Sequence, residues 1–75
     1  MRQEKANREY LEVLNKLIKE YGSREVCAEV YIHKANHLRR LEPKRADEAL
    51  KVCEEGLKRY PAYKRINELK NIREQ

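Results

Sequence analysis

The sequence predicts an all-α protein built from about four antiparallel helices. Apolar residues recur at spacings of three and four along most of the chain, which is the spacing of one face of an α-helix. Charged residues make up 41% of the 75 residues, whereas Gly and Pro number two each, and this composition suits long, solvated helices better than a turn-rich β fold. A chain of this length has room for one small domain, so we expect a single helical domain over residues 1–75.

The first helix is predicted over residues 5–21. Its apolar side chains fall on one line or directly beside it: Tyr10, Leu14, Leu17, Tyr21, Leu11 and Ile18. Gly22 can adopt the left-handed conformation that ends a helix, and Ser23 can cap the helix that follows. So short a connection favours antiparallel neighbours.

The second helix is predicted over residues 24–41, and Pro43 is expected to end it. The side chains that it directs toward the core are Cys27, Val30, Tyr31, Ala35, Leu38 and Leu41. The third helix is predicted over residues 45–60. Its apolar stripe consists of Ala46, Ala49, Leu50, Cys53, Gly56, Leu57 and Tyr60.

The third helix carries two small residues, Ala49 and Gly56, two turns apart on its apolar stripe. Because such small side chains let a neighbouring helix come close, we expect Gly56 to be a point of contact between helices. Pro61 then stops the helix. A short fourth helix is predicted over residues 62–73, with an apolar line of Tyr63, Ile66, Leu69 and Ile72.

An internal comparison indicates a repeat with an offset of about 39 residues. At this offset EYLEVLNKLIKEYG lies over EALKVCEEGLKRYP, and the coinciding pairs are Glu9 and Glu48, Leu11 and Leu50, Val13 and Val52, Lys19 and Lys58, and Tyr21 and Tyr60. The chain then contains a half-repeat over 5–22, a complete helix pair over 24–60 and a half-repeat over 62–74, as a segment of a larger protein would. A plain helical bundle is the alternative.

The stretch from Ala28 to Pro61 resembles the tetratricopeptide repeat, a helix–turn–helix unit. The residues that carry the resemblance are Tyr31, Ala35 and Leu38 in the first helix of the pair and Ala49, Cys53, Gly56 and Pro61 in the second. The period of 39 departs from the usual 34 of this family. The resemblance implies an α-solenoid fragment whose concave face binds an extended peptide or a helix of another protein, without catalysis and without a cofactor.

In the resembled family the first helix of each pair lines the groove. The matching residues that face away from the core line here are Ile32, Asn36, Arg39 and Arg40. The guanidinium groups suit carboxylates and Asn36 suits a peptide backbone, so the predicted partner is an acidic peptide. A solvated basic face is the alternative interpretation of the same residues.

Other chemistry finds little support in the sequence. His33 and His37 follow Glu29 on one helical line, but two imidazoles make a weak metal site, so we expect none. Cys27 and Cys53 are expected to be buried free thiols, because they lie too far apart along the two helices for a disulfide. No nucleophile–base pair or phosphate loop is recognisable, so we expect no enzyme.

Charge and hydropathy limit the class of partner. The net charge of +5 comes from interspersed basic and acidic residues rather than from a basic stripe, which argues against nucleic acid. No apolar run approaches the roughly 20 residues that span a bilayer, and localisation is left open. The alternative to a peptide-binding module is a purely structural helical segment of a larger polypeptide, or a homodimer formed through the end helices.

Overall fold

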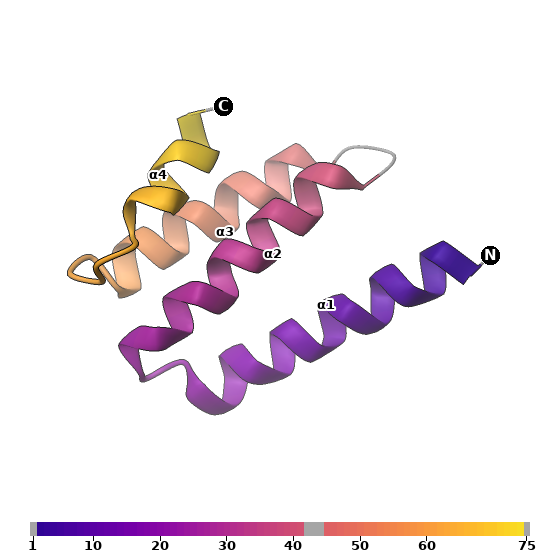
Figure 1. Cartoon of the computed structure of the whole chain (residues 1–75), viewed down its shortest axis with the longest axis horizontal. Helices are drawn as coiled ribbons and strands as arrows, with labels where there is room; N and C mark the ends of the chain where they lie inside the picture. The colour runs from indigo at the N-terminus through magenta and orange to yellow at the C-terminus, as the bar shows by residue number, and fades with distance from the viewer. Residues whose placement is uncertain (1, 42–44, 75) are drawn as a thin grey trace.

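The computed structural model describes residues 2–41 and 45–74, and the regular elements of these residues are all helical (Figure 1). The α-helices are α1 (Arg2–Tyr21), α2 (Ala28–Arg40), α3 (Ala46–Arg59) and α4 (Asn67–Glu74), and a 3₁₀ turn, η1 (Glu25–Cys27), precedes α2. The predicted all-α class is therefore confirmed. Pro43 lies outside the described residues.

The centre of the molecule is the antiparallel pair of α2 and α3, with α1 on one side and α4 on the other (Figure 1). Helix α4 packs against both α2 and α3, whereas α1 packs only against α2 and η1 among the described elements. Helix α2 is thus enclosed by three neighbours. The buried cluster that joins these elements consists of Cys27, Ala28, Tyr31, Ile32, Ala35, Leu38, Ala49, Val52, Cys53, Tyr60, Ile66, Leu69 and Ile72.

Gly56 is a point of close contact between three helices, as predicted. A Cβ atom at Gly56 would lie 2.5 Å from Leu69 Cδ1 of α4 and 3.3 Å from Tyr31 Cβ of α2. Such distances leave no room for a side chain without movement of the neighbours. The absence of a side chain at Gly56 therefore lets α3 approach both α2 and α4.

Gly22 ends α1 for a different reason from the one predicted. Its φ lies outside the left-handed region, so the predicted left-handed conformation is wrong. A Cβ atom there would lie 2.5 Å from the carbonyl oxygen of Ile18 and 2.9 Å from Arg59 Nη2. The Tyr60 hydroxyl donates a hydrogen bond of 2.6 Å to the Gly22 carbonyl, which ties the end of α1 to the end of α3. Close approach, rather than backbone conformation, therefore explains this glycine.

Two predicted helix starts differ from the structure. The second helix is preceded by η1, whose N-terminal flanking residue is Arg24, and no side chain caps it, so the predicted cap by Ser23 is absent. The fourth helix begins at Asn67 rather than near residue 62. Between α3 and α4 the backbone makes two successive turns, with hydrogen bonds from Tyr63 N to Tyr60 O and from Ile66 N to Tyr63 O. These turns occupy the residues after Pro61, so α4 starts five residues later than predicted.

The apolar stripes are covered unevenly. In α3, Ala49, Cys53 and Gly56 are buried as predicted, but Ala46 is exposed and Leu50 is 41% exposed. These two lie in the first turns of α3, where α4 does not fully cover them. Tyr10 and Tyr21 of α1 are also exposed, because α1 has α2 on one side only. Cys27 and Cys53 are buried free thiols, which confirms that prediction.

Candidate functional site

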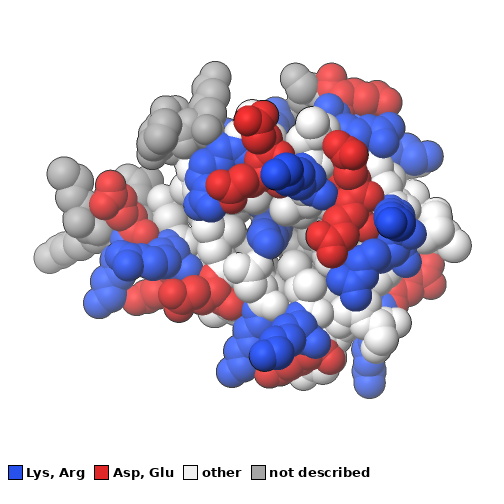
Figure 2. Space-filling view, turned by 180° about the vertical axis from the view of Figure 1, so that it is seen from behind, with Lys and Arg blue, Asp and Glu red and all other residues white. Residues whose placement is uncertain are grey.

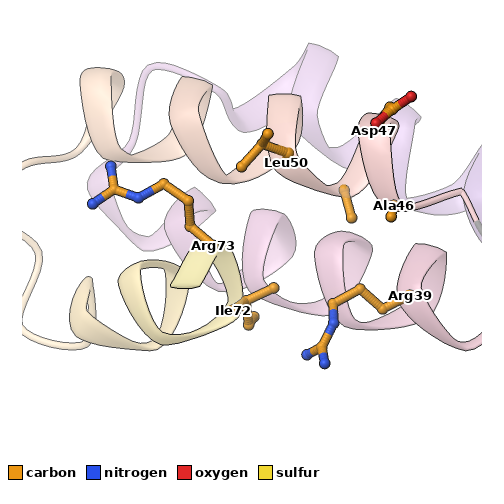
Figure 3. Close-up of a pocket in the computed structure, with 7 residues that line it drawn as sticks. Arg39, Ala46, Asp47, Leu50, Ile72 and Arg73 are labelled. Carbon is orange, nitrogen blue, oxygen red and sulfur yellow. The ribbon is translucent and has the colours of Figure 1, made fainter. Parts of the chain in front are cut away.

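A cavity of about 370 Å³ lies where the C-terminal ends of α2 and α4 meet the first turns of α3 (Figure 3). Its lining consists of Arg39 from α2, of Ala46, Asp47, Ala49 and Leu50 from α3, and of Ile72 and Arg73 from α4. The alanines are the reason for the hollow, since their short side chains do not fill the space between the helices. Three elements from distant parts of the sequence thus form one concave surface.

The floor of this cavity is apolar and partly open to solvent. Ala49 and Ile72 are almost fully buried, while Leu50 keeps 41% of its surface exposed. Figure 3 shows Leu50 and Ile72 in the space between α3 and α4. An apolar ligand group that enters here would remove Leu50 from water, which is favourable at roughly 25 cal/mol per Å² of buried area.

Arg39 and Arg73 place positive charge at two edges of the floor. Each lies in the last turn of its helix, where the helix dipole favours a cation. Their guanidinium groups lie at separate edges of the cavity (Figure 3). Both are exposed, and neither forms an ion pair with a residue in the ranges 2–41 and 45–74.

The pKa of the buried Cys53 thiol in α3 is affected by both positive charges. Burial raises the pKa of Cys53, and the positive charges of Arg39 and then Arg73 act in the opposite direction on the same pKa. The Glu54 carboxylate acts on the same pKa in the direction of burial. The net shift of this pKa is upward, so burial outweighs both guanidinium groups at the thiol.

Asp47 is the acidic residue among those that line the cavity. It lies in the first turn of α3, where the positive end of the helix dipole favours a carboxylate. Its carboxylate points away from Leu50 and Ile72, on the outer side of α3 (Figure 3).

The structure separates the four predicted site residues. Ile32 is only 4% exposed and belongs to the buried core cluster, so the prediction that it faces away from the core is wrong. The physical reason is the packing of α4 on α2, which extends the buried arc of α2 to Ile32. Arg39 lines the cavity, whereas Asn36 is half-buried and Arg40 is exposed, and neither of these two lines the cavity.

Sequence reasoning missed Arg73, Leu50 and Ile72 as members of this surface. Leu50 and Ile72 were assigned to core stripes from their spacing, which does not tell how far a neighbour covers each residue. Arg73 follows Ile72 directly, but nothing in the sequence places the end of the fourth helix beside the end of the second. The sequence contains one indication of this site: both arginines lie at C-terminal helix ends, where the helix dipole favours a cation.

A second cavity, of about 410 Å³, lies at the opposite end of the α2–α3 pair and is lined by Gly22, Ser23, Glu25, Arg59, Tyr60, Pro61 and Ala62. Two of its polar side chains, Arg59 and Tyr60, already have partners within the protein. Arg59 Nη1 donates to the Tyr31 hydroxyl at 2.6 Å, and Tyr60 donates to the Gly22 carbonyl. These hydrogen bonds hold α1, α2 and α3 together, so this cavity is the weaker candidate.

The described residues contain no group of three or more His, Cys, Asp and Glu side chains that could hold a metal ion. His33 is exposed, and the ring of His37 packs edge-on against Tyr10 of α1, with 4.7 Å between the ring centroids. His37 thus serves the contact between α1 and α2. None of the helices in the described part of the chain is long and apolar enough to cross a membrane.

On the side of the molecule opposite to the view of Figure 1, basic and acidic side chains alternate (Figure 2). That face therefore offers no continuous basic stripe of the kind that follows a phosphate backbone. Comparisons of the chain with models of protein families, with curated proteins and with solved structures found no match. The candidate site therefore rests on its own geometry and charge.

Proposed function

We propose that the protein is an interaction module that binds an acidic segment of another protein, without catalysis, in the cavity between α2, α3 and α4. The observation that carries the proposal is the pairing of an apolar floor, which leaves Leu50 partly exposed, with two arginines that have no ion-pair partner within residues 2–41 and 45–74. Apolar surface supplies affinity, and the guanidinium groups select carboxylates.

The proposed ligand carries two acidic residues that flank an aliphatic one. Arg39 and Arg73 lie at separate edges of the floor, so they suit two carboxylates rather than one (Figure 3). The aliphatic side chain would contact Leu50 and Ile72.

The TPR-like interpretation of the fold is part of this proposal. In it α2 and α3 form one helix pair, α4 is the first helix of the next pair, and α1 is the second helix of a preceding one. Two features support it: the antiparallel packing of α2 on α3, and the close contact of Gly56 with both Tyr31 and Leu69. In such modules the first helices, here α2 and α4, line the groove, whereas the cavity also takes Ala46, Asp47, Ala49 and Leu50 from the second helix α3.

The test is an NMR titration of the labelled protein with a short peptide in which an aliphatic residue lies between acidic ones. We expect amide shifts at the cavity-lining residues, and weaker binding as salt concentration rises, because exposed charge pairs are screened. Arg39→Ala and Arg73→Ala should each weaken binding about fivefold, the effect of losing roughly 1 kcal/mol from an exposed charge pair.

Arg40→Ala is the matched control, since Arg40 is adjacent in α2, equally basic and outside the cavity. It should bind like the wild type. Equal losses of affinity in all three variants would mean that binding depends only on net charge. Amide shifts outside the cavity would mean that the peptide binds elsewhere. Either result contradicts the proposed site.

A further inference from the structure

Helix α1 has an apolar face that the rest of the described chain leaves open. Its buried or half-buried residues Leu11, Leu14 and Ile18 face α2 and η1. A second line of residues runs beside them: Ala6, Tyr10, Val13 and Leu17, which we call the α1 seam. Ala6 is exposed, Tyr10 is 40% and Val13 is 54% exposed, and Leu17 is half-buried.

The α1 seam has the spacing of a coiled-coil contact. Its members follow one another at intervals of four, three and four residues, which is the alternation of core positions in a heptad repeat. Tyr10 is held in place from one side by the edge-on contact with His37. The seam is therefore an ordered apolar line on a stable helix, and it suits another helix.

The charges beside the α1 seam indicate which helix this is. Glu9 and Lys16 directly precede Tyr10 and Leu17, so both lie along the same edge of the seam, and both are exposed. In an antiparallel pair of identical helices, this edge of one copy faces the same edge of the other. Glu9 then meets Lys16 of the second copy, and Lys16 meets Glu9 of the second copy.

We infer that the α1 seam pairs with the α1 seam of a second copy of this chain in an antiparallel, two-fold symmetric dimer. The apolar layers are complementary in the same arrangement, because Ala6 lies opposite Leu17 and Tyr10 opposite Val13 of the second copy. A parallel pair would instead place Glu9 and Lys16 opposite Leu14 and Tyr21, with no charge pairing. Charge complementarity thus selects both the partner and its direction.

The test is sedimentation velocity of the full chain at low salt over a range of concentrations up to about 1 mM, because a contact of about three helical turns is short and its charges are screened by salt. The wild type is expected to dimerise with rising concentration. Glu9→Lys and Lys16→Glu should each weaken the dimer about tenfold, since each reversal converts two attractive pairs into two repulsive ones.

Mixing the two reversed chains gives the sharpest result. In a heterodimer of Glu9→Lys with Lys16→Glu, both contacts again join opposite charges, so the mixture should associate like the wild type. The chain carrying both reversals should also recover. The result that net charge does not explain is the weakening by Lys16→Glu, because this reversal lowers the formal net charge of +5 by two units and would otherwise reduce repulsion between the two copies.

Matched controls lie on the same helix and elsewhere in the chain. Glu12→Lys and Lys19→Glu make the same charge changes at exposed positions away from the α1 seam and should leave dimerisation unchanged. Val13→Asp should abolish it, while Val26→Asp, at a residue of similar exposure in η1, should not. Circular dichroism should be used to check that each variant is folded. A wild type that stays monomeric at all concentrations, or single reversals that fail to weaken the dimer, would overturn the inference.

Discussion

Gly56 shows how one missing side chain fixes the distance between three helices. A Cβ atom at this position would lie 2.5 Å from Leu69 Cδ1 and 3.3 Å from Tyr31 Cβ, and both neighbours are buried. Gly inside a helix is unfavourable by roughly 1 kcal/mol relative to Ala, so its use here requires a compensating contact. Close packing of α3 on α2 and α4 is that contact.

Replacement of Gly56 by Leu should lower the free energy of unfolding by about 1–3 kcal/mol, because the added atoms overpack a site with no free volume. Urea denaturation followed by circular dichroism measures the change. Lys51→Leu, at an exposed position of the same helix, is the control for added apolar bulk and should have little effect. Equal stability of Gly56→Leu and the wild type would contradict the packing of α3 described above.

Tyr60 makes the free energy of unfolding depend on pH in the alkaline range. Burial raises the pKa of its hydroxyl above the usual value near 10, and the hydroxyl donates to the Gly22 carbonyl. Above about pH 10 the unfolded chain loses this proton while the folded chain keeps it, so stability is complete below pH 10 and declines as pH rises further. Burial also raises the pKa of Tyr31, which acts in the same direction.

Tyr60→Phe should reduce this alkaline loss of stability, since the variant has no proton to lose at that position. At neutral pH it should be less stable by about 0.5–1.5 kcal/mol, because the hydrogen bond to the Gly22 carbonyl is gone. Urea denaturation at pH 8 and pH 11 measures both effects. If the unfolding free energy fell by the same amount between pH 8 and pH 11 in Tyr60→Phe and in the wild type, Tyr60 would not couple proton release to folding.

At the scale of elements, α4 depends on its packing for its existence. It has eight residues, fewer than the roughly 12–15 that an isolated helix needs in water. It is held by buried Leu69 and Ile72 and by the turn before it, where Tyr63 and Arg65 both donate to the Glu29 carboxylate of α2. Loss of the apolar contacts should therefore release the helix from the α2–α3 pair.

Leu69→Ala should lower the unfolding free energy by about 2–5 kcal/mol, because Leu69 is fully buried and its removal leaves a cavity. Amide hydrogen exchange should show the largest loss of protection over residues 67–74. The control is Lys70→Ala at the exposed neighbouring residue, and it should keep the wild-type rate of amide hydrogen exchange in α4. Uniform loss of protection across all helices would mean that α4 is not a separate unit of stability.

The helices also differ in how completely their apolar faces are used. Helix α2 has neighbours on three sides and buries residues around much of its circumference, including Ile32. Helix α1 has one helical neighbour besides η1, so one apolar line is covered while the α1 seam stays open. The proposed dimer follows from this difference in the number of neighbours.

At the scale of the whole molecule, two surfaces of different chemistry lie on opposite sides of the α2–α3 pair. The α1 seam is apolar with one acid and one base at its edge, and it suits a copy of itself. The cavity beside α4 combines an apolar floor with two arginines, and it suits an acidic segment. The two proposals are independent, since the residues of one lie in α1 and those of the other in α2, α3 and α4.

Periodicity and composition were sufficient for the all-α class, for the approximate positions of the helices and for most of the core, because a helix that leaves its apolar stripe in water is not stable. Local chemistry also identified Gly56 as a contact and the two cysteines as buried. Each of these predictions used the spacing of residues within one helix, although the contacts of Gly56 are with Tyr31 and Leu69 of other helices.

Only the tertiary structure decided how far each stripe is covered and which helix ends meet. The packing of α4 determines the burial of Ile32 and the exposure of Leu50. It also brings Arg39 and Arg73 to two edges of one cavity. The spacing of apolar residues states that a face needs a neighbour, but it carries no information on which element supplies it or at what angle. Long-range packing therefore set the candidate site, while local pattern set the helices that carry it.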